Sequence, residues 1–338
     1  MKKIGLITKK LLREFFVTGR NYSYKFALYD LCWWILFYLR PPFSFQISSV
    51  VLRKKTEWLD CYFAEKYSSV LNSFQDAAEK EITSGDDPLN IWVFWGQGEE
   101  NMPPLIKACY KQLTKYNDNV ILVTNQNVEK YIHLSTVIYE KVQNGIITWA
   151  HFSDIVRNTL LARYGGLWLD ATVWVPGKLP LDKLKDYSIY SANGEMTFNS
   201  RSMCFWTSLD WNWSTWCLWA NQKNTLLFSL VSAMLKEIAE TETAFPDYVV
   251  QDYFIYYACC KFPSVAVDMA RCREIPCQRK NELAAIMNKT YDEKIYRDLC
   301  KDEMVFKLSF RSSWKLETDE GKQTFYGKVL SGPFAIPE

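Results

Sequence analysis

The chain has 338 residues, of which 49% are apolar and 23% are charged. This balance is typical of a folded protein with a large core, and it excludes a disordered chain. The formal net charge of +2 gives no reason to expect nucleic acid as a partner.

Cysteine and histidine are too scattered to indicate a metal centre. The ten cysteines form no CxxC pair and repeat no spacing, so we expect no zinc site and reduced thiols in a cytoplasmic protein. The only two histidines, His133 and His151, exclude a His-rich metal centre. Carboxylates are therefore the groups in which to look for chemistry.

The beginning of the chain is basic and aromatic. Residues 1–25 carry seven Lys or Arg against the single acid Glu14, and apolar residues recur there at helical spacing. The apolar run 26–39 that follows contains Asp30 and is shorter than the roughly 20 residues that span a bilayer. We expect residues 1–85 to form a helical extension, either peripheral on the inner face of the cell membrane or packed on the catalytic domain.

A catalytic domain is expected over 86–338, after a helical pattern at 56–83 and a polar turn. The apolar runs at 91–95 and 120–124, with a helical stretch at 103–115 between them, predict a βαβ unit. A helix at 150–164 and a strand at 166–175 follow. Strands alternating with helices predict an α/β fold that binds its ligand at the carboxyl ends of the strands.

The segment 150–175 carries the most specific pattern. Asp154 and Arg157 are three apart on the expected helix and share a face. Gly165 and Gly166 end that helix and let the chain turn sharply into the next strand. Asp170 and Thr172 are two apart on that strand, so both side chains are expected to point the same way and could hold one ion. Each feature alone also suits a salt bridge or a turn.

The run SDIVRNTLLARYGGLWLDATV resembles the donor-binding core of the capsular polysaccharide synthesis glycosyltransferases, which are similar to the sugar transferases that carry a DXD motif. IWVFWGQGEENMPPLIKACY resembles the first strand, loop and helix of the same family. The resemblance covers roughly residues 88–315. It implies a GT-A type fold with a Rossmann-like, mainly parallel sheet flanked by helices, and a hexosyltransferase that retains the anomeric configuration. It also implies a nucleotide-sugar donor, with UDP-sugars favoured, and a glycan or lipid-linked glycan acceptor.

The resemblance also implies roles for individual residues. Trp95 would stack on the nucleotide base, Asp154 and Arg157 would hold the sugar and phosphates of the donor, and Asp170 would bind ribose and metal. The residues expected to act in catalysis are Asp170, Arg157 and Asp252. Those expected to bind substrate are Trp95, Thr124, Asp154, Arg157, Gly165, Gly166, Trp216, Lys307, Ser309 and Trp314.

The sequence departs from the DXD pattern at Thr172, where the wider group has a second aspartate. The expected Mn²⁺ or Mg²⁺ ion would have Asp170 and Thr172 as ligands, and a hydroxyl binds such ions more weakly than a carboxylate. Donor phosphates or another acid would have to complete the shell. Metal dependence is therefore an open question.

Two further patterns have both a functional and a structural interpretation. Five tryptophans between 199 and 220 could form an acceptor wall or an aromatic core. Asp252, on an apolar helical stretch, would be unfavourable to bury unless it is paired or faces a site. Lys307, Ser309 and Trp314 lie in a segment that resembles one closing over the donor in related enzymes.

Three other functions compete with the transferase. A nucleotidyltransferase would need a Gly-rich loop with a basic residue, and IWVFWGQGEENMPP contains no base. A glycoside hydrolase would need two facing carboxylates. A membrane-associated scaffold that binds nucleotide-sugars without turning them over is suggested by the basic extension and the reduced DXD motif.

Overall fold

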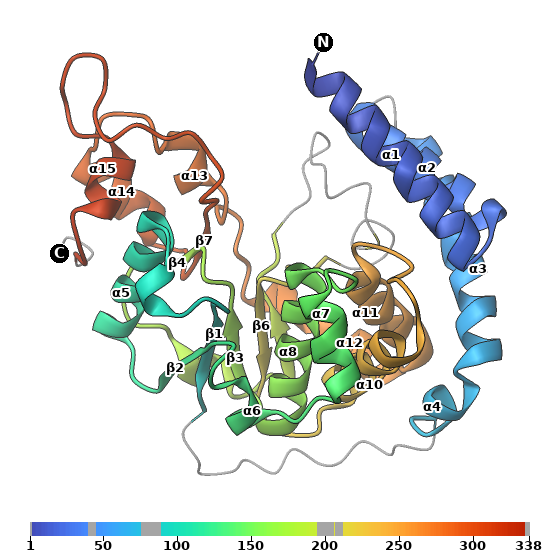
Figure 1. The fold of residues 1–338 in the computed structure, drawn as a ribbon. Coiled ribbons are helices and arrows are strands. Elements are labelled where there is room, and N and C mark those ends of the chain that lie inside the picture. The colour runs from blue at the N-terminus through green and yellow to red at the C-terminus, as the bar shows by residue number, and fades with distance from the viewer. Residues whose placement is uncertain (1, 40–44, 76–88, 195–205, 207–211, 335–338) are drawn as a thin grey trace.

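The computed structural model describes residues 2–39, 45–75, 89–194, 206 and 212–334. Its first part is helical and lies along one side of the molecule (Figure 1). The helices there are α1 (Lys2–Asn21), α2 (Tyr24–Leu39), α3 (Phe45–Lys66) and α4 (Ser68–Asn72). The described residues before 76 are thus mainly helical, whereas the division of the chain at residue 86 lies outside the described residues and stays a prediction.

A five-stranded sheet forms the centre of the molecule, in the order β2-β1-β3-β6-β5. Its strands are β1 (Ile91–Phe94), β2 (Val120–Val123), β3 (Gly166–Leu169), β5 (Ile189–Ser191) and β6 (Cys217–Ala220). Strand β1 pairs in parallel with β2 and β3, whereas β6 runs antiparallel to both β3 and β5. The expected mixed α/β fold with a mainly parallel sheet is confirmed.

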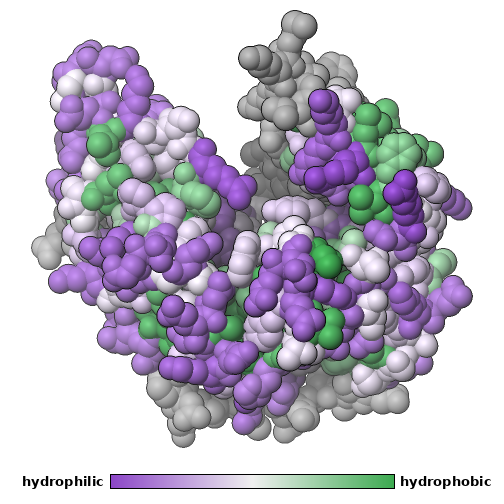
Figure 2. Space-filling model, in the orientation of Figure 1, coloured by the Kyte–Doolittle hydropathy of each residue, from purple (hydrophilic) through white to green (hydrophobic). Residues whose placement is uncertain are grey.

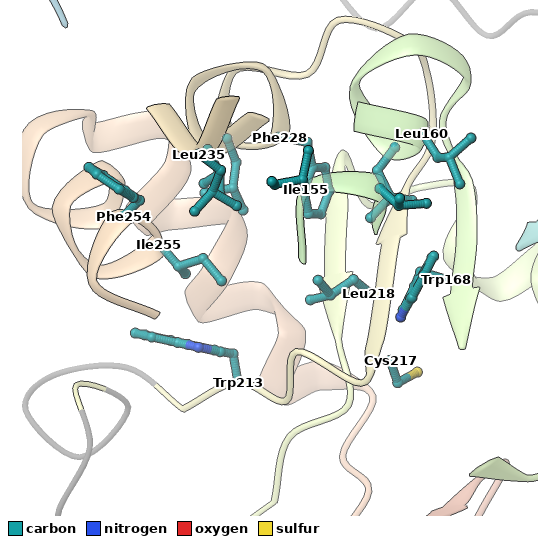
Figure 3. Packing of buried hydrophobic residues seen from close by; sticks show 14 of the residues in the cluster. Ile155, Leu160, Trp168, Trp213, Cys217, Leu218, Phe228, Leu235, Phe254 and Ile255 are labelled. Atoms are coloured by element: carbon teal, nitrogen blue, oxygen red, sulfur yellow. The ribbon is translucent and has the colours of Figure 1, made fainter. Parts of the chain in front are cut away.

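Helices surround this sheet, and two of them match the expected ranges closely: α5 (Pro104–Tyr116) and α8 (Trp149–Tyr164). The others are α6 (Val128–Tyr131), α7 (Thr136–Gln143), α9 (Leu181–Leu184), α10 (Leu226–Thr241), α11 (Val250–Lys261) and α12 (Pro263–Arg271), with 3-10 turns at Glu99–Asn101 and Cys272–Glu274. Figure 3 shows side chains of α8, α10 and α11 packed with those of β3 and β6, among them Ile155, Phe228 and Leu218.

A smaller unit at the C-terminus packs beside α5. It contains α13 (Glu282–Ile286), α14 (Glu293–Cys300), α15 (Phe325–Leu330) and the two-stranded sheet formed by β4 (Val173–Trp174) and β7 (Phe306–Lys307). Its own core holds Trp174, Tyr296 and Phe325, all fully or almost fully buried. Figure 1 shows this unit and the N-terminal helices on opposite sides of the central sheet.

The expected single strand over 166–175 is wrong. Strand β3 ends at Leu169, the chain turns at Ala171 and Thr172, and β4 then joins a different sheet. The turn is closed by the Val173 amide, which donates to the Asp170 carbonyl at 2.9 Å, while the Asp170 amide donates to the Trp216 carbonyl at 2.9 Å. Asp170 and Thr172 therefore lie at a turn between two sheets, not on one strand.

Gly166 begins β3 in a position that excludes a side chain. Its φ is +93°, and a Cβ atom would lie 2.3 Å from the Asn90 carbonyl oxygen. Backbone strain at a positive φ costs about 1–3 kcal/mol, and the clash of the new carbon with Asn90 adds to that cost. We therefore expect Gly166→Ala to lower the free energy of unfolding by more than the strain alone. Gly321→Ala is the matched control, because Gly321 has φ +74° with nothing within 4 Å of the added carbon. Equal losses in urea denaturation would contradict this explanation.

The N-terminal helices are fastened to the rest of the molecule by buried polar contacts. Lys55 of α3 forms ion pairs with Asp30 of α2 and with Asp247, which precedes α11. Tyr62 of α3 and Tyr67, which follows α3, each donate a hydrogen bond to Glu242 at 2.6 Å. Lys55 of α3 thus links α2 to the segment before α11, and Asp30 has a buried partner.

Two further features concern the described residues alone. None of their helices combines the length and apolar character needed to cross a bilayer. Cysteine side chains of the described residues that are present as thiols include Cys109, Cys217, Cys272 and Cys300, and Cys204 lies outside the described residues.

Candidate active site

A cleft of about 700 Å³ opens where the carboxyl ends of β1 and β3 meet. Parallel strands bring these ends to one edge of the sheet, where α/β proteins bind their ligands. In Figure 2 the surface is hollowed between the C-terminal unit and the N-terminal helices. The residues singled out from the sequence that line the cleft are Trp95, Asp154, Arg157, Asp170, Thr172, Asp252, Lys307 and Ser309.

Asp170, directly after β3, is the centre of this cluster. Its Oδ1 atom accepts hydrogen bonds from Arg157 Nη2 and from Trp168 Nε1, both at 3.0 Å. Its Oδ2 atom accepts from Lys307 Nζ at 2.7 Å. One carboxylate thus holds two cations, one on each oxygen.

Arg157 lies on the buried face of α8, and neighbouring side chains contact its guanidinium group on three sides. Its Nη1 atom donates to Asp154 Oδ1 at 2.9 Å and to Gln251 Oε1 at 3.1 Å. Its guanidinium carbon lies 5.0 Å from the centre of the Trp168 ring, a cation–π distance. Arg157 Nε and Gln251 Nε2 are buried donors that find no acceptor among the described residues. These atoms could donate to a ligand.

The small second sheet brings Lys307 to Asp170. Lys307 of β7 pairs with Val173 of β4, and the Leu308 amide donates to the Thr172 carbonyl at 3.1 Å. Lys307 Nζ also donates to Thr172 Oγ1 at 2.9 Å and lies 5.7 Å from the centre of the Trp216 ring. A segment near the end of the chain thereby completes the site at the end of β3.

The three aspartates of the cleft differ in their charge. Burial acts to raise the pKa of Asp170, but Lys307 and Arg157 outweigh it and lower that pKa to about 2. Burial raises the pKa of Asp154 to about 7, against the opposing effect of Arg157. Burial likewise raises the pKa of Asp252 to about 6, although Trp213 Nε1 donates to its Oδ1 atom at 2.6 Å. Asp170 is the permanent anion of the site, and the other two titrate near neutrality.

The raised pKa of Asp154 predicts a pH-dependent stability. Its folded-state pKa of about 7 exceeds the ordinary 3.8, so its stabilising contribution is present below about pH 4 and is lost as the pH rises through 7. Asp154→Asn cannot ionise, so we expect it to gain stability relative to the wild type between pH 5 and 8. Thermal unfolding of both proteins at several pH values measures this difference. A difference that does not change with pH would contradict a raised pKa.

Other residues singled out from the sequence lie outside the cleft lining. Gly165 and Gly166 are at the opposite end of β3 from Asp170, and Thr124 follows β2 with its amide bonded to Asn127 Oδ1 at 2.7 Å. Trp216 lies beneath Lys307, and Trp314 packs on Tyr326 in the C-terminal core. Among the clustered tryptophans, Trp206, Trp213 and Trp219 are buried, which favours the core interpretation for them, and Trp211 lies outside the described residues.

The cleft also contains residues that the sequence patterns did not reveal. Trp168 supports both Asp170 and Arg157, and the exposed Tyr248 and Arg311 stand at the cleft wall. Trp168 lies inside the run that resembles the donor-binding core, and this position could have identified it as a residue of the site. Arg311 lies between Ser309 and Trp314, in the segment that resembles one closing over the donor, whereas Tyr248 lies outside the runs that carry the resemblance.

The residues expected to bind Mn²⁺ or Mg²⁺ do not fit a divalent cation. Such an ion prefers several oxygen ligands. Here the Asp170 carboxylate and the Thr172 hydroxyl both already accept hydrogen bonds from the Lys307 ammonium group. Within the described residues, no group of three or more His, Cys, Asp or Glu side chains is placed to hold a metal ion. An ion between Asp170 and Thr172 would have to displace Lys307.

Two known proteins are similar to part of this chain. Over 102 residues the chain is 29% identical to Glycosyltransferase afumC of Aspergillus fumigatus, and over 96 residues it is 31% identical to O-glycosyltransferase PaGT of Phomopsis amygdali. These matches cover 27% and 25% of this chain and 26% and 24% of those proteins, so the chain spans about a quarter of the length of these curated relatives.

The sequence profile of capsular polysaccharide synthesis proteins matches residues 41–329, which include α3, the central sheet and the C-terminal unit. The match contains every residue of the cleft. The chain therefore belongs to the capsular polysaccharide synthesis protein family.

Proposed function

We propose that this protein is a glycosyltransferase that moves a sugar from a nucleotide-diphosphate donor, a UDP-sugar in the first instance, to a glycan or lipid-linked glycan. The observation that carries the proposal is the pairing of Arg157 and Lys307 on the two oxygens of Asp170, inside a cleft at the carboxyl edge of the sheet. Two fixed cations suit a diphosphate, which gains negative charge when it leaves the sugar. The family and the two transferases that the chain resembles support this chemistry.

The cleft offers a place for each part of the donor. Trp95 is half-buried after β1 and meets Phe310 edge to face at 5.9 Å, so one of its faces could stack on a base. Lys307 and Arg157 would hold the diphosphate, and Asp154 and Asp252 would contact the sugar. We place the acceptor at the open side of the cleft near the exposed Tyr248.

In the proposed reaction, the bond between the anomeric carbon and the phosphate oxygen breaks, and its electron pair goes to the diphosphate. The acceptor oxygen bonds to the same carbon from the same face, and its proton passes to the departing phosphate oxygen. The configuration is then retained without a protein nucleophile. Trapping a glycosyl-enzyme intermediate on Asp154 or Asp252 would contradict this route.

The N-terminal helices are proposed to bind the surface of an anionic membrane. Exposed apolar side chains lie on α1, α2 and α3, and Figure 2 shows hydrophobic and hydrophilic residues side by side over these helices. The exposed apolar residues include Leu12, Phe16, Leu28, Ile35, Ile47 and Val50. The exposed cations nearby in the sequence are Lys9, Lys10, Arg13, Arg20 and Lys25. Sedimentation with phosphatidylserine vesicles should capture the protein, and equal capture by phosphatidylcholine vesicles would contradict the role of charge.

The non-catalytic scaffold is the second candidate. It is favoured by the way Asp170, the central carboxylate, is already neutralised by two cations of the chain itself. A scaffold would bind donors without consuming them.

Turnover of donors separates the two functions. The purified protein is incubated with UDP-, GDP- and CMP-linked sugars, with acceptor glycans added in a second series, and the released nucleotide is measured. We expect one donor to be consumed by the wild type, no consumption by Asp170→Asn, and normal consumption by the control Asp182→Asn, whose side chain is exposed on α9. Binding of a donor without release in either series would favour the scaffold.

A further inference from the structure

We propose that Lys307 takes the place of a divalent cation in this protein, so that the donor diphosphate is neutralised by the chain's own cations and binding needs no metal ion. The inference rests on the proposed function of the cleft. It departs from the metal that the DXD resemblance implies, because the described residues do not fit that metal.

The position of the lysine ammonium carries the argument. Lys307 Nζ lies 2.7 Å from Asp170 Oδ2 and 2.9 Å from Thr172 Oγ1, which are the two groups expected to hold the ion. The ammonium therefore occupies the space between them. An ion placed there would lie next to a like charge in a partly buried site, which is unfavourable.

Thr172 stands where the DXD motif has its second aspartate, and a threonine there suits an ammonium group better than a metal ion. A second aspartate would give the site two negative charges, which a divalent cation balances. Asp170 and Thr172 together carry only one negative charge, and Lys307 and Arg157 already pair with it. These two groups therefore offer no unbalanced negative charge to a divalent cation.

Lys307 is also held where a phosphate could reach it. The pairing of β7 with β4 fixes its backbone, and the Trp216 ring lies below its ammonium. Its side chain remains 27% exposed on the cleft side. An ammonium has three N–H donors, so the two bonds to Asp170 and Thr172 leave one for a diphosphate oxygen.

Two arginines can supply the rest of the charge that a metal would bring. Arg157 has a buried Nε donor without an acceptor among the described residues. Arg311 lines the cleft, is exposed, and forms no ion pair with an acidic side chain of the described residues. Lys307, Arg157 and Arg311 together could surround a diphosphate.

Calorimetric titration with UDP, GDP and inorganic pyrophosphate tests the inference, because binding can be measured without turnover. Each titration is run in EDTA and in Mn²⁺. We expect the wild type to bind at least one of the three equally well in both solutions. Lys307→Met should weaken binding about tenfold to a hundredfold, as expected for loss of a hydrogen bond from a charged group. Lys322→Met, which removes an exposed lysine paired with Glu320, should have no effect.

A double variant gives a second, independent readout. Thr172→Asp combined with Lys307→Met provides two carboxylates and no competing ammonium. We expect it to bind Mn²⁺ together with UDP, so that the electron paramagnetic resonance spectrum of manganese changes beyond the change that UDP alone causes. The wild type added to Mn²⁺ and UDP should cause no further change. Thermal unfolding checks that both variants are folded.

The outcomes distinguish this inference from the proposed function. Binding of nucleotide or pyrophosphate by the wild type that requires Mn²⁺ overturns the role of Lys307 and leaves the transferase standing. A change that the wild type causes in the manganese spectrum, beyond the change caused by UDP alone, does the same. Unchanged affinity in Lys307→Met also overturns it. A wild type that binds none of the three compounds in either solution overturns the donor site and this inference together.

Discussion

Arg157→Met will reduce donor turnover by about a hundredfold to a thousandfold, the range seen when a fixed electrostatic donor is removed from an active site. The guanidinium connects Asp154, Gln251 and Asp170, and in the proposed reaction it faces the departing diphosphate. Its removal leaves Asp154 without its cation. Asp170 then keeps only one of its two cationic partners, Lys307. The measurement is the initial rate of nucleotide release at saturating donor.

Arg157→Lys separates charge from geometry. A lysine keeps the positive charge but cannot reach three acceptors in one plane. We therefore expect it to restore much of the thermal stability lost in Arg157→Met while leaving the rate low. Wild-type turnover by Arg157→Lys would show that charge alone is needed. That result would contradict the proposed role of the planar guanidinium group.

Lys55→Met will lower the free energy of unfolding by about 3–5 kcal/mol, because it leaves buried carboxylates without their cation. The Lys55 side chain is fully buried and pairs with Asp247 and, at 2.5 Å, with Asp30. The ammonium also lies 4.5 Å from the centre of the Trp33 ring. Urea denaturation followed by circular dichroism measures the loss.

The preceding residue gives a matched control on the same helix. Lys54 is exposed and pairs with Glu57 at 2.7 Å, so Lys54→Met should change stability by less than about 1 kcal/mol. Replacing all three members of the buried cluster, as Asp30→Asn, Lys55→Met and Asp247→Asn, should recover part of the loss because no charge is then left unpaired. A Lys55→Met protein as stable as Lys54→Met would contradict the buried ion pairs.

The same cluster connects the N-terminal helices with the cleft. Asp247 is followed by Tyr248 and Val249, which line the cleft wall, and α11 then presents Gln251. A shift of this segment would move a bonding partner of Arg157. We therefore expect Lys55→Met to weaken donor binding as well as stability, although Lys55 itself does not line the cleft.

Much of the central fold could be predicted from local patterns. The short apolar runs at 91–95 and 120–124 and the helix expected at 150–164 correspond to β1, β2 and α8. The expected strand at 166–175 failed at Asp170, because continuous apolar character cannot show where a chain leaves one sheet for another. The turn depends on the Trp216 carbonyl, which comes from a distant part of the sequence.

Three residues at the centre of the cleft could be singled out from the sequence, but their contacts could not. Asp154, Arg157 and Asp170 lie within one recognisable run, and the structure places them in one cluster. The bond from Lys307 to Asp170 and Thr172 depends on the pairing of two-residue strands, which leave no periodic signal. Lys55 likewise stands in the run Arg53, Lys54, Lys55, where local composition indicates a solvated face, and only tertiary packing buries the last of the three.

The most direct test of the donor site is a crystal structure of the protein with UDP bound in the presence of EDTA. We predict that the uracil stacks on Trp95, and that the diphosphate lies within hydrogen-bond distance of Lys307 and of Arg157 or Arg311. UDP bound away from the Asp170 cleft, or with its diphosphate turned away from Lys307, would contradict this account.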